Sequence, residues 1–163
     1  MNLRAWLVSI APRRLKQAYP TPKVDVRGAV FRDGEILLVR EEADGRWTLP
    51  GGWAEVGEPP SAAVEREVRE ESGYTVRAVK LAGVFDLARL RDGRPLRPNV
   101  YKLFFVCELA DGRAGEIVGF ETSEARFFAR NALPELSAPR VTREQVERVW
   151  EHARDPARPT DFD

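Results

Sequence analysis

The chain has 163 residues, of which 43% are hydrophobic, so it is long enough to bury the core of one ordinary domain. Its 26 basic and 26 acidic residues give a formal net charge of zero, which argues against a global field that recruits nucleic acid or membrane. Cys107 is the only cysteine, so an intrachain disulfide is excluded and a cytoplasmic location is expected.

The first 22 residues are expected to form a helix and a linker ahead of the main domain. Apolar side chains, among them Trp6 and Leu7, predict an amphipathic helix over residues 3–18, and prolines predict a linker over residues 19–22. Such a helix favours packing on its own domain or on a second copy of the chain, and a homodimer is therefore expected. Binding to a membrane surface is the alternative interpretation of the same helix.

The next part of the chain alternates between apolar and polar residues in a way that predicts a series of strands. The predicted strands cover residues 24–31, 35–40, 47–49, 75–87, 100–109 and 124–129. Asp33 and Gly34 predict a hairpin turn between the first two strands. Cys107 falls within an apolar strand and is interpreted as a core residue rather than a nucleophile.

Residues 137–163 are assigned to the same domain as a C-terminal helix and tail. Thr142 is a good N-cap for a helix over residues 142–154, and His152 near its end is expected to be structural. Residues 155–163 are interpreted as a loose terminus. Strands on both sides of a central helix, followed by a terminal helix, predict the α/β class with a mixed sheet between helices.

The most informative stretch is residues 49–74, LPGGWAEVGEPPSAAVEREVREESGY, in which a glycine-rich loop leads into an acid-rich helix. At about 100° per residue Glu67, Glu70 and Glu71 share one arc with apolar positions, so they point toward the protein body. Arg66 falls on the opposite side of the helix. The crowded carboxylates require a positive partner, and Mg²⁺, which takes oxygen ligands, fits that need. A solvated acidic helix is the alternative interpretation.

Gly52, Glu58 and the run REVREESGY of residues 66–74 match the pattern G-x5-E-x7-R-E-U-x-E-E-x-G-U, in which U is bulky and apolar. The chain is therefore similar to the Nudix hydrolases. The resemblance implies an α/β/α sandwich and a Nudix domain over residues 23–136. Residues 22–29, 44–50 and 121–128 further resemble the branch that contains CDP-choline and ADP-ribose pyrophosphatases.

The resemblance also assigns roles to the residues of the motif. It implies that Glu67, Glu70, Glu71 and the backbone carbonyl of Gly51 bind Mg²⁺ or Mn²⁺, and that Glu67 is a candidate base. Arg66 would orient these carboxylates through salt bridges.

Three further motif residues are implied to be structural. Glu58 would brace the loop, and Gly52 would allow a close approach of the backbone. Gly73 would adopt the left-handed conformation just past the helix end.

Family members hydrolyse a nucleoside diphosphate linked to another moiety by attack of water on phosphorus. In some of them a carboxylate on a later loop activates the water, and here Glu121 is favoured over Glu116 and Glu124. Trp53 is a candidate to stack on the nucleobase. Arg97 lies in the arginine-rich segment 88–99 between two strands and is a candidate contact to substrate phosphate. Contact with a partner subunit and a solvated loop are the alternative interpretations of this segment.

The substrate expected from the resemblance is a CDP-choline-like or ADP-ribose-like diphosphate. Many ADP-ribose pyrophosphatases have a proline beyond the motif where this chain has residues 88–90, ARL, so the choice between the two stays open. Hydrolysis of nucleoside triphosphates is the enzymatic alternative. A Nudix-fold module that senses a nucleotide without hydrolysing it is a further alternative, although such modules commonly lose the glutamates that are all present here.

Overall fold

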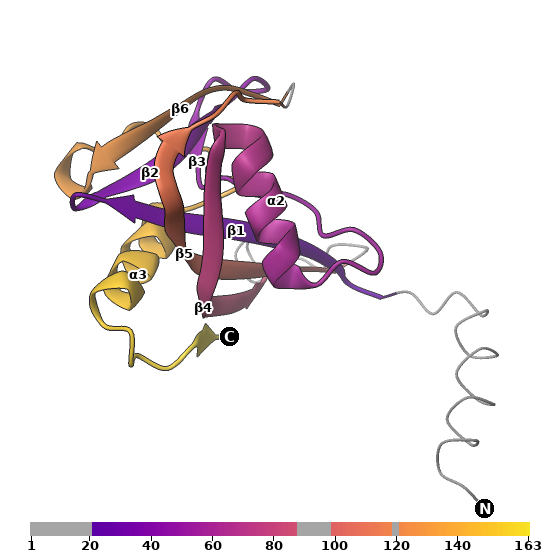
Figure 1. Cartoon of the computed structure of the whole chain (residues 1–163). Helices are drawn as coiled ribbons and strands as arrows, with labels where there is room; N and C mark the ends of the chain where they lie inside the picture. Colours follow the sequence, from indigo (N-terminus) through magenta and orange to yellow (C-terminus); the bar gives the residue numbers. More distant parts are fainter. Residues whose placement is uncertain (1–20, 88–98, 119–120) are drawn as a thin grey trace, which may run out of the picture.

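The computed structural model describes residues 21–87, 99–118 and 121–163 (Figure 1). Within these residues the strands are β1 (Lys23–Arg32), β2 (Glu35–Glu41), β3 (Trp47–Thr48), β4 (Tyr74–Asp86), β5 (Val100–Ala114), β6 (Thr122–Ala129) and β7 (Asp161–Phe162). The helices are α2 (Pro60–Ser72), the 3-10 helix η1 (Arg130–Ala132) and α3 (Arg143–Arg154). The strands pair in the order β3-β2-β1-β5-β4-β7, with β6 on β2. The predicted fold class, a mixed sheet between helices, is confirmed.

Strand β1 lies in the middle of the sheet. It runs parallel to β5, with Lys23 opposite Val100 and Val30 opposite Cys107, and antiparallel to β2. The hairpin between β1 and β2 turns at Asp33 and Gly34, whose φ angles are 51° and 78°, as the sequence predicted. Because helices cover both faces of the sheet, six successive residues of β1 are buried.

Helix α2 packs on one face of the sheet through Val64 and Val68. Gly28 of β1 allows this approach, since a Cβ at that position would lie 2.5 Å from the Cγ2 atom of Val68. The helix starts at Pro60 and is followed by Gly73 in the left-handed conformation, with φ 73°. The close contact places the acid-rich side of α2 next to the strands.

Helix α3 packs on the opposite face of the sheet. Thr142 caps its start in a capping box, because its hydroxyl accepts a bond from the N–H of Gln145 while the Gln145 side chain accepts one from the N–H of Thr142. Trp150 is buried and contacts the ring of Phe31 at a centroid distance of 5.4 Å. Together with α2, this helix completes the sandwich of a sheet between helical layers (Figure 1).

The C-terminal segment is not the loose terminus that the sequence suggested. Its residues Asp161 and Phe162 form β7, which pairs in parallel with Gly83 and Val84 of β4. The Thr160 hydroxyl donates a hydrogen bond of 2.9 Å to the carbonyl of Leu81. The prediction was wrong because this strand depends on a distant partner and carries no local alternation of its own.

Asp161 anchors this segment to α3. Its carboxylate lies 3.2 Å from Nε2 of the buried His152, 3.4 Å from Nη1 of Arg148 and 3.7 Å from Nη2 of Arg158. Burial opposes ionisation, but the hydrogen bond with His152 and the two guanidinium groups hold the pKa of Asp161 below its usual value. His152 therefore has the structural role that was predicted for it.

Substituting Asp161 by asparagine tests this anchor. We expect the free energy of unfolding at pH 7 to fall by about 1 kcal/mol, because the charge that faces two arginines is lost. A carboxylate with a lowered pKa contributes stability above its unfolded pKa and loses it as the pH falls through the folded pKa. The free energy of unfolding is measured in urea for both proteins. Its difference between wild type and Asp161→Asn should therefore shrink below about pH 4. A difference that stays constant down to pH 3 would contradict this.

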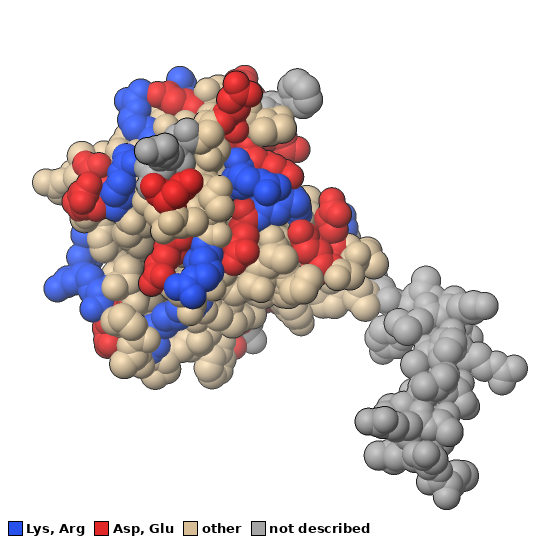
Figure 2. Space-filling model, in the orientation of Figure 1, with Lys and Arg blue, Asp and Glu red and all other residues tan. Residues whose placement is uncertain are grey.

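Several expectations concern residues outside the described ranges. The predicted helix over residues 3–18 and the arginine-rich segment with Arg97 are among them. No helix in the described parts of the chain is both long and apolar enough to cross a membrane. On the face seen in Figure 2, basic and acidic side chains are interspersed over the described residues, in keeping with the net charge of zero.

Candidate active site

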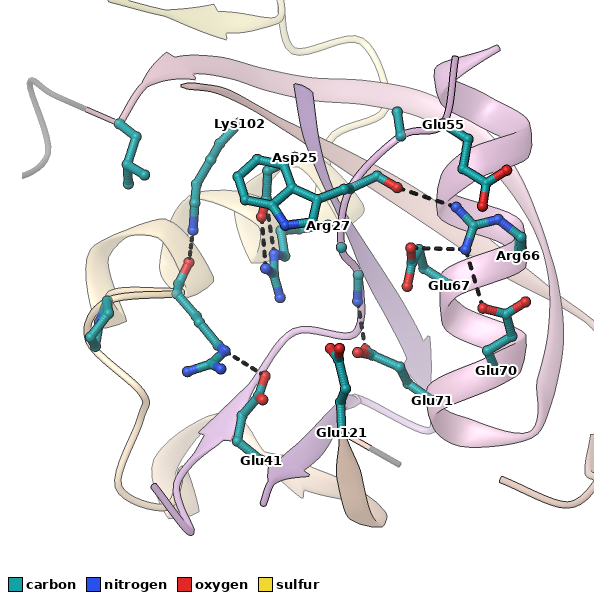
Figure 3. A pocket seen from close by; sticks show the side chains of 17 residues that line it. Asp25, Arg27, Glu41, Glu55, Arg66, Glu67, Glu70, Glu71, Lys102 and Glu121 are labelled. Carbon is teal, nitrogen blue, oxygen red and sulfur yellow. Dashed lines mark hydrogen bonds and ion pairs between the residues drawn. The ribbon is translucent and has the colours of Figure 1, made fainter. Parts of the chain in front are cut away.

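A cleft of about 680 Å³ lies between α2, the glycine-rich loop and the ends of the central strands (Figure 3). Its lining includes eight of the residues predicted from the sequence: Gly51, Gly52, Trp53, Arg66, Glu67, Glu70, Glu71 and Glu121. Glu58 contacts this group through Arg66 without lining the cleft, and Gly73 ends α2. Arg97 lies outside the described residues.

The glycine-rich loop is held against the edge of β1 by its backbone. The N–H of Val26 donates to the carbonyl of Gly52, and the N–H of Gly28 donates to the carbonyl of Pro50, both at 2.8 Å. Gly51 has a φ of 146°, and a Cβ at this position would lie 1.9 Å from the carbonyl oxygen of Val26. A side chain is therefore excluded at Gly51, and the loop is fixed beside the acidic helix.

Gly52 makes room for the carboxylate of Glu67. A Cβ at position 52 would lie 2.9 Å from the carboxyl carbon and from both oxygens of Glu67. The side chain of Glu67 is only 14% exposed, and its burial raises its pKa despite the opposing effect of Arg66. Glu70, one turn further, is 39% exposed. The carboxylates of α2 thus differ in exposure, with Glu67 mostly buried and Glu70 partly exposed.

Arg66 connects the loop and the helix. Its guanidinium donates two bonds of 3.0 Å to Glu58, one of 2.9 Å to Glu67, one of 3.1 Å to Glu70 and one of 3.2 Å to the carbonyl of Trp53. The hydrogen bonds from Arg66 lower the pKa of Glu58. Helical periodicity placed Arg66 opposite the carboxylates, which is wrong for its guanidinium because the long side chain reaches around the helix.

Glu71 is the most buried carboxylate of the helix. It is 7% exposed and accepts a hydrogen bond of 2.8 Å from the N–H of Gly51. Burial raises its pKa to about 8, although the Gly51 N–H and the charge of Arg27 favour the ionised form. A cation beside Glu71 would offset the cost of ionising a carboxylate in this position.

The donor chemistry of the cleft suits a hard divalent cation. Mg²⁺ binds through oxygen and typically combines one or two protein carboxylates with phosphate oxygens and water. Glu67 and Glu71 are carboxylates whose burial disfavours an uncompensated charge, and Gly52 leaves the space that Glu67 occupies. Among the residues that the structure describes, no three acidic, histidine or cysteine side chains already converge on one point. A cation bound by these carboxylates would replace contacts that Arg66 and Gly51 now make with them.

Glu121 reaches the cleft from the start of β6, whereas Glu116 and Glu124 do not line it. The backbone around it is tied to two elements: the N–H of Glu42 donates to the Glu121 carbonyl at 2.9 Å, and the Thr122 hydroxyl donates to the Glu71 carbonyl at 3.1 Å. A bulge between Arg40 and Glu41 interrupts the pairing of β2 with β6 next to this point. The bulge and the two tethers hold Glu121 beside the carboxylates of α2 (Figure 3).

The cleft also contains charged residues that the sequence analysis did not single out. These are Asp25 and Arg27 of β1, Glu41 of β2, Glu55 of the loop before α2, Lys102 of β5 and Arg140 after η1. A signal for three of them was present, since Asp25, Arg27 and Lys102 interrupt strands that are otherwise apolar and buried. Charged residues are rarely buried without a functional or structural partner.

Trp53 is 50% exposed at the edge of the cleft, and the ammonium group of Lys23 lies 5.2 Å from the centre of its ring. Other rings in the strands are engaged in packing. Trp47 packs edge-to-face on Phe128, and Phe104 does so on Phe85 within the core. Trp53 is therefore a ring at the cleft with accessible surface.

The comparison with known protein families agrees with this geometry. Residues 21–149 match the NUDIX domain family. The chain belongs to the Nudix family. The loop, the acid-rich helix and the sheet that holds them are thus a Nudix domain, and the chain is a Nudix pyrophosphohydrolase.

Individual Nudix relatives cover most of the chain. A putative ADP-ribose pyrophosphatase of Bacillus subtilis is 44% identical over 149 residues, which are 91% of this chain and 70% of the relative. A crystal structure of an ADP-ribose pyrophosphatase from Streptococcus suis has a TM-score of 0.77 and 36% identity, and the match covers 88% of this chain and all of that one. A crystal structure of a UDP-X diphosphatase has a TM-score of 0.79 and 33% identity, covering all of this chain and 76% of that one.

Proposed function

We propose that the Nudix cleft hydrolyses the pyrophosphate bond of a nucleoside diphosphate joined to another moiety. The observation that carries this proposal is a pair of carboxylates, the mostly buried Glu67 and the buried Glu71. Burial raises the pKa of both, and both lie in one cleft with Glu121. Such a cluster can bind a cation on one side of a diphosphate and activate water on the other.

ADP-ribose-like and UDP-linked diphosphates are the substrates that we propose first, because the names of the relatives state substrates of these two types. A CDP-choline-like diphosphate stays a proposal from the sequence, and nucleoside triphosphates are the alternative. The half-exposed ring of Trp53 would stack on a nucleobase. The arginine-rich segment with Arg97 would contact substrate phosphate.

Mg²⁺, with Mn²⁺ as the alternative, would be held by Glu67, Glu71 and the carbonyl of Gly51, with Glu70 as a further or water-mediated ligand. When bound, the ion neutralises charge on the transferring phosphoryl group and favours deprotonation of water. Arg66 would keep Glu67 and Glu70 in position through the bonds described above. Release of one of these bonds would free the carboxylate for the ion.

The identity of the base is tested by comparing Glu121→Gln with Glu67→Gln. If Glu121 accepts the proton from water, Glu121→Gln lowers kcat by about 100-fold and leaves the affinity for Mg²⁺ unchanged. Glu67→Gln, in contrast, weakens Mg²⁺ binding measured by calorimetry. Unchanged kcat in Glu121→Gln, together with normal Mg²⁺ affinity in Glu67→Gln, would contradict both assignments.

The reaction is tested by product analysis in water enriched in ¹⁸O. Wild-type protein is incubated with Mg²⁺ and with ADP-ribose, UDP-glucose, CDP-choline or a nucleoside triphosphate, and products are identified by mass spectrometry. We expect a nucleoside monophosphate and the phosphorylated second moiety, with ¹⁸O in only one of them. A preference for triphosphates would favour the alternative, and intact substrate in every reaction would reject the proposal.

The remaining expectations concern the whole chain. We propose that residues 1–22 form an appended helix and linker, that residues 23–136 form the Nudix domain, and that residues 137–163 complete the same domain. The packing of α3 and β7 on the sheet supports the last assignment. A homodimer and a cytoplasmic location remain proposals from the sequence.

A further inference from the structure

The side of the cleft opposite α2 carries positive charge. Of the residues that the structure describes, four basic ones line the cleft: Arg27, Arg66, Lys102 and Arg140. Lys102 and Glu41 lie across the cleft from Arg66, Glu67 and Glu70 (Figure 3). Acidic side chains outnumber the basic ones in the lining, and a diphosphate would bring further negative charge. A basic side chain that stays accessible on this side of the cleft would therefore favour binding of such a substrate.

Three of the four cations are engaged or buried. Arg66 is bound to three carboxylates and to the carbonyl of Trp53. Arg27 is 5% exposed and donates two bonds of 2.8 Å to the carboxylate of Asp25. Lys102 is 3% exposed, and its ammonium group donates to the carbonyl of Arg140. These side chains hold the walls of the cleft in place and offer little surface to a substrate.

Arg140 differs from them because its side chain is 31% exposed. Its Nε lies 2.8 Å from a carboxylate oxygen of Glu41, and its Nη1 donates to the Ser137 hydroxyl at 3.3 Å and lies 3.9 Å from the carboxylate of Asp44. The guanidinium is thus held beside Glu41, and about a third of the side chain stays exposed in the lining of the cleft.

We propose that Arg140 binds a non-bridging phosphoryl oxygen of the substrate, on the phosphate group farther from α2. This rests on the proposed diphosphate hydrolysis. A planar guanidinium matches the geometry of phosphoryl oxygens, and its bonds to them are charge-assisted. Glu41 acts as a positioning residue, because its ion pair with Nε holds the guanidinium in the cleft before the substrate arrives. The cation held by the carboxylates of α2 and the guanidinium of Arg140 would then contact the two phosphates from opposite sides.

A purely structural role of Arg140 is the competing explanation. Glu41 is 4% exposed, so Arg140 also neutralises a buried carboxylate. The two roles are separated by the double variant Glu41→Gln with Arg140→Gln, which removes both charges and allows a neutral hydrogen bond. If Arg140 only neutralises Glu41, the double variant regains the function that Arg140→Gln loses. If Arg140 binds phosphate, the double variant stays impaired.

The experiment measures kcat/KM for the best substrate and the Kd of the α,β-methylene analogue of ADP-ribose in Mg²⁺. We expect Arg140→Gln to lower kcat/KM and to weaken analogue binding by about 10- to 100-fold, and the double variant to be no better. Glu41→Gln should lose only a few-fold, since the guanidinium remains. Arg77→Gln, an exposed arginine paired with Glu108 outside the cleft, is the matched control and should equal wild type.

Two results would overturn the inference: an Arg140→Gln variant that binds the analogue as tightly as wild type, or a double variant with wild-type affinity. Wild type that binds no analogue would overturn it as well. Wild type that binds the analogue but hydrolyses no substrate would reject the proposed function, while the Kd values of the variants still decide the role of Arg140.

Discussion

Replacing Glu71 by glutamine is expected to abolish Mg²⁺-dependent hydrolysis while the fold stays intact. Glu71 is buried, and burial raises its pKa to about 8, so the apo protein accommodates an uncharged group at this position. Glutamine retains an oxygen for the N–H of Gly51. It cannot supply the negative charge that a divalent cation requires. We expect kcat/KM to fall on the order of 10³-fold.

The measurement combines steady-state kinetics with calorimetric titration of Mg²⁺ and thermal unfolding. Glu65→Gln is the matched control, because Glu65 lies on the same helix and accepts a bond from the N–H of Ala78 without lining the cleft. It should behave like wild type in all three assays. Wild-type Mg²⁺ affinity or activity in Glu71→Gln would contradict the assignment of Glu71 as a ligand.

Replacing Arg66 by methionine is expected to lower both stability and activity. Three carboxylates, Glu58, Glu67 and Glu70, lose the cation that they share, and Glu67 and Glu70 then repel each other one turn apart. We expect the free energy of unfolding without metal to fall by about 2 kcal/mol. Mg²⁺ should restore part of this loss, because it supplies positive charge to the same carboxylates. The kcat is expected to fall at least about 10-fold, as positioning of Glu67 is lost.

Urea unfolding with and without Mg²⁺ measures both effects. Arg69→Met is the control, since Arg69 is an exposed arginine on the same helix that does not line the cleft. Its substitution should change the free energy of unfolding by less than about 0.5 kcal/mol. If Arg66→Met is as stable as Arg69→Met and gains nothing from Mg²⁺, the guanidinium does not have the role described here.

Most of the fold could be predicted because its signals are local. The hairpin at Asp33 and Gly34 follows from two adjacent residues, and the start of α3 follows from Thr142 with Gln145 three positions later. β7 was missed because its two residues form a strand only by pairing with Gly83, which is far away in sequence. Nothing in the local pattern of the tail indicates that partner.

The candidate site was predictable where its residues follow one another in the chain. Glu67, Glu70 and Glu71 lie on one helix, so their common direction follows from helical spacing. Arg27, Glu41 and Arg140 come from different elements and meet only through the sheet. The reach of Arg66 around the helix was also missed, since periodicity describes where a Cβ points and not where a long side chain ends.

The central claim is that this Nudix cleft hydrolyses a nucleoside diphosphate derivative through carboxylates that bind a divalent cation. The most direct test is the rate of hydrolysis of ADP-ribose and UDP-glucose by wild-type protein treated with a chelator and then titrated with Mg²⁺. We expect no hydrolysis in excess chelator and recovery of the rate as free Mg²⁺ is restored. Undiminished hydrolysis in excess chelator, or no hydrolysis of either compound at saturating Mg²⁺, would contradict the claim.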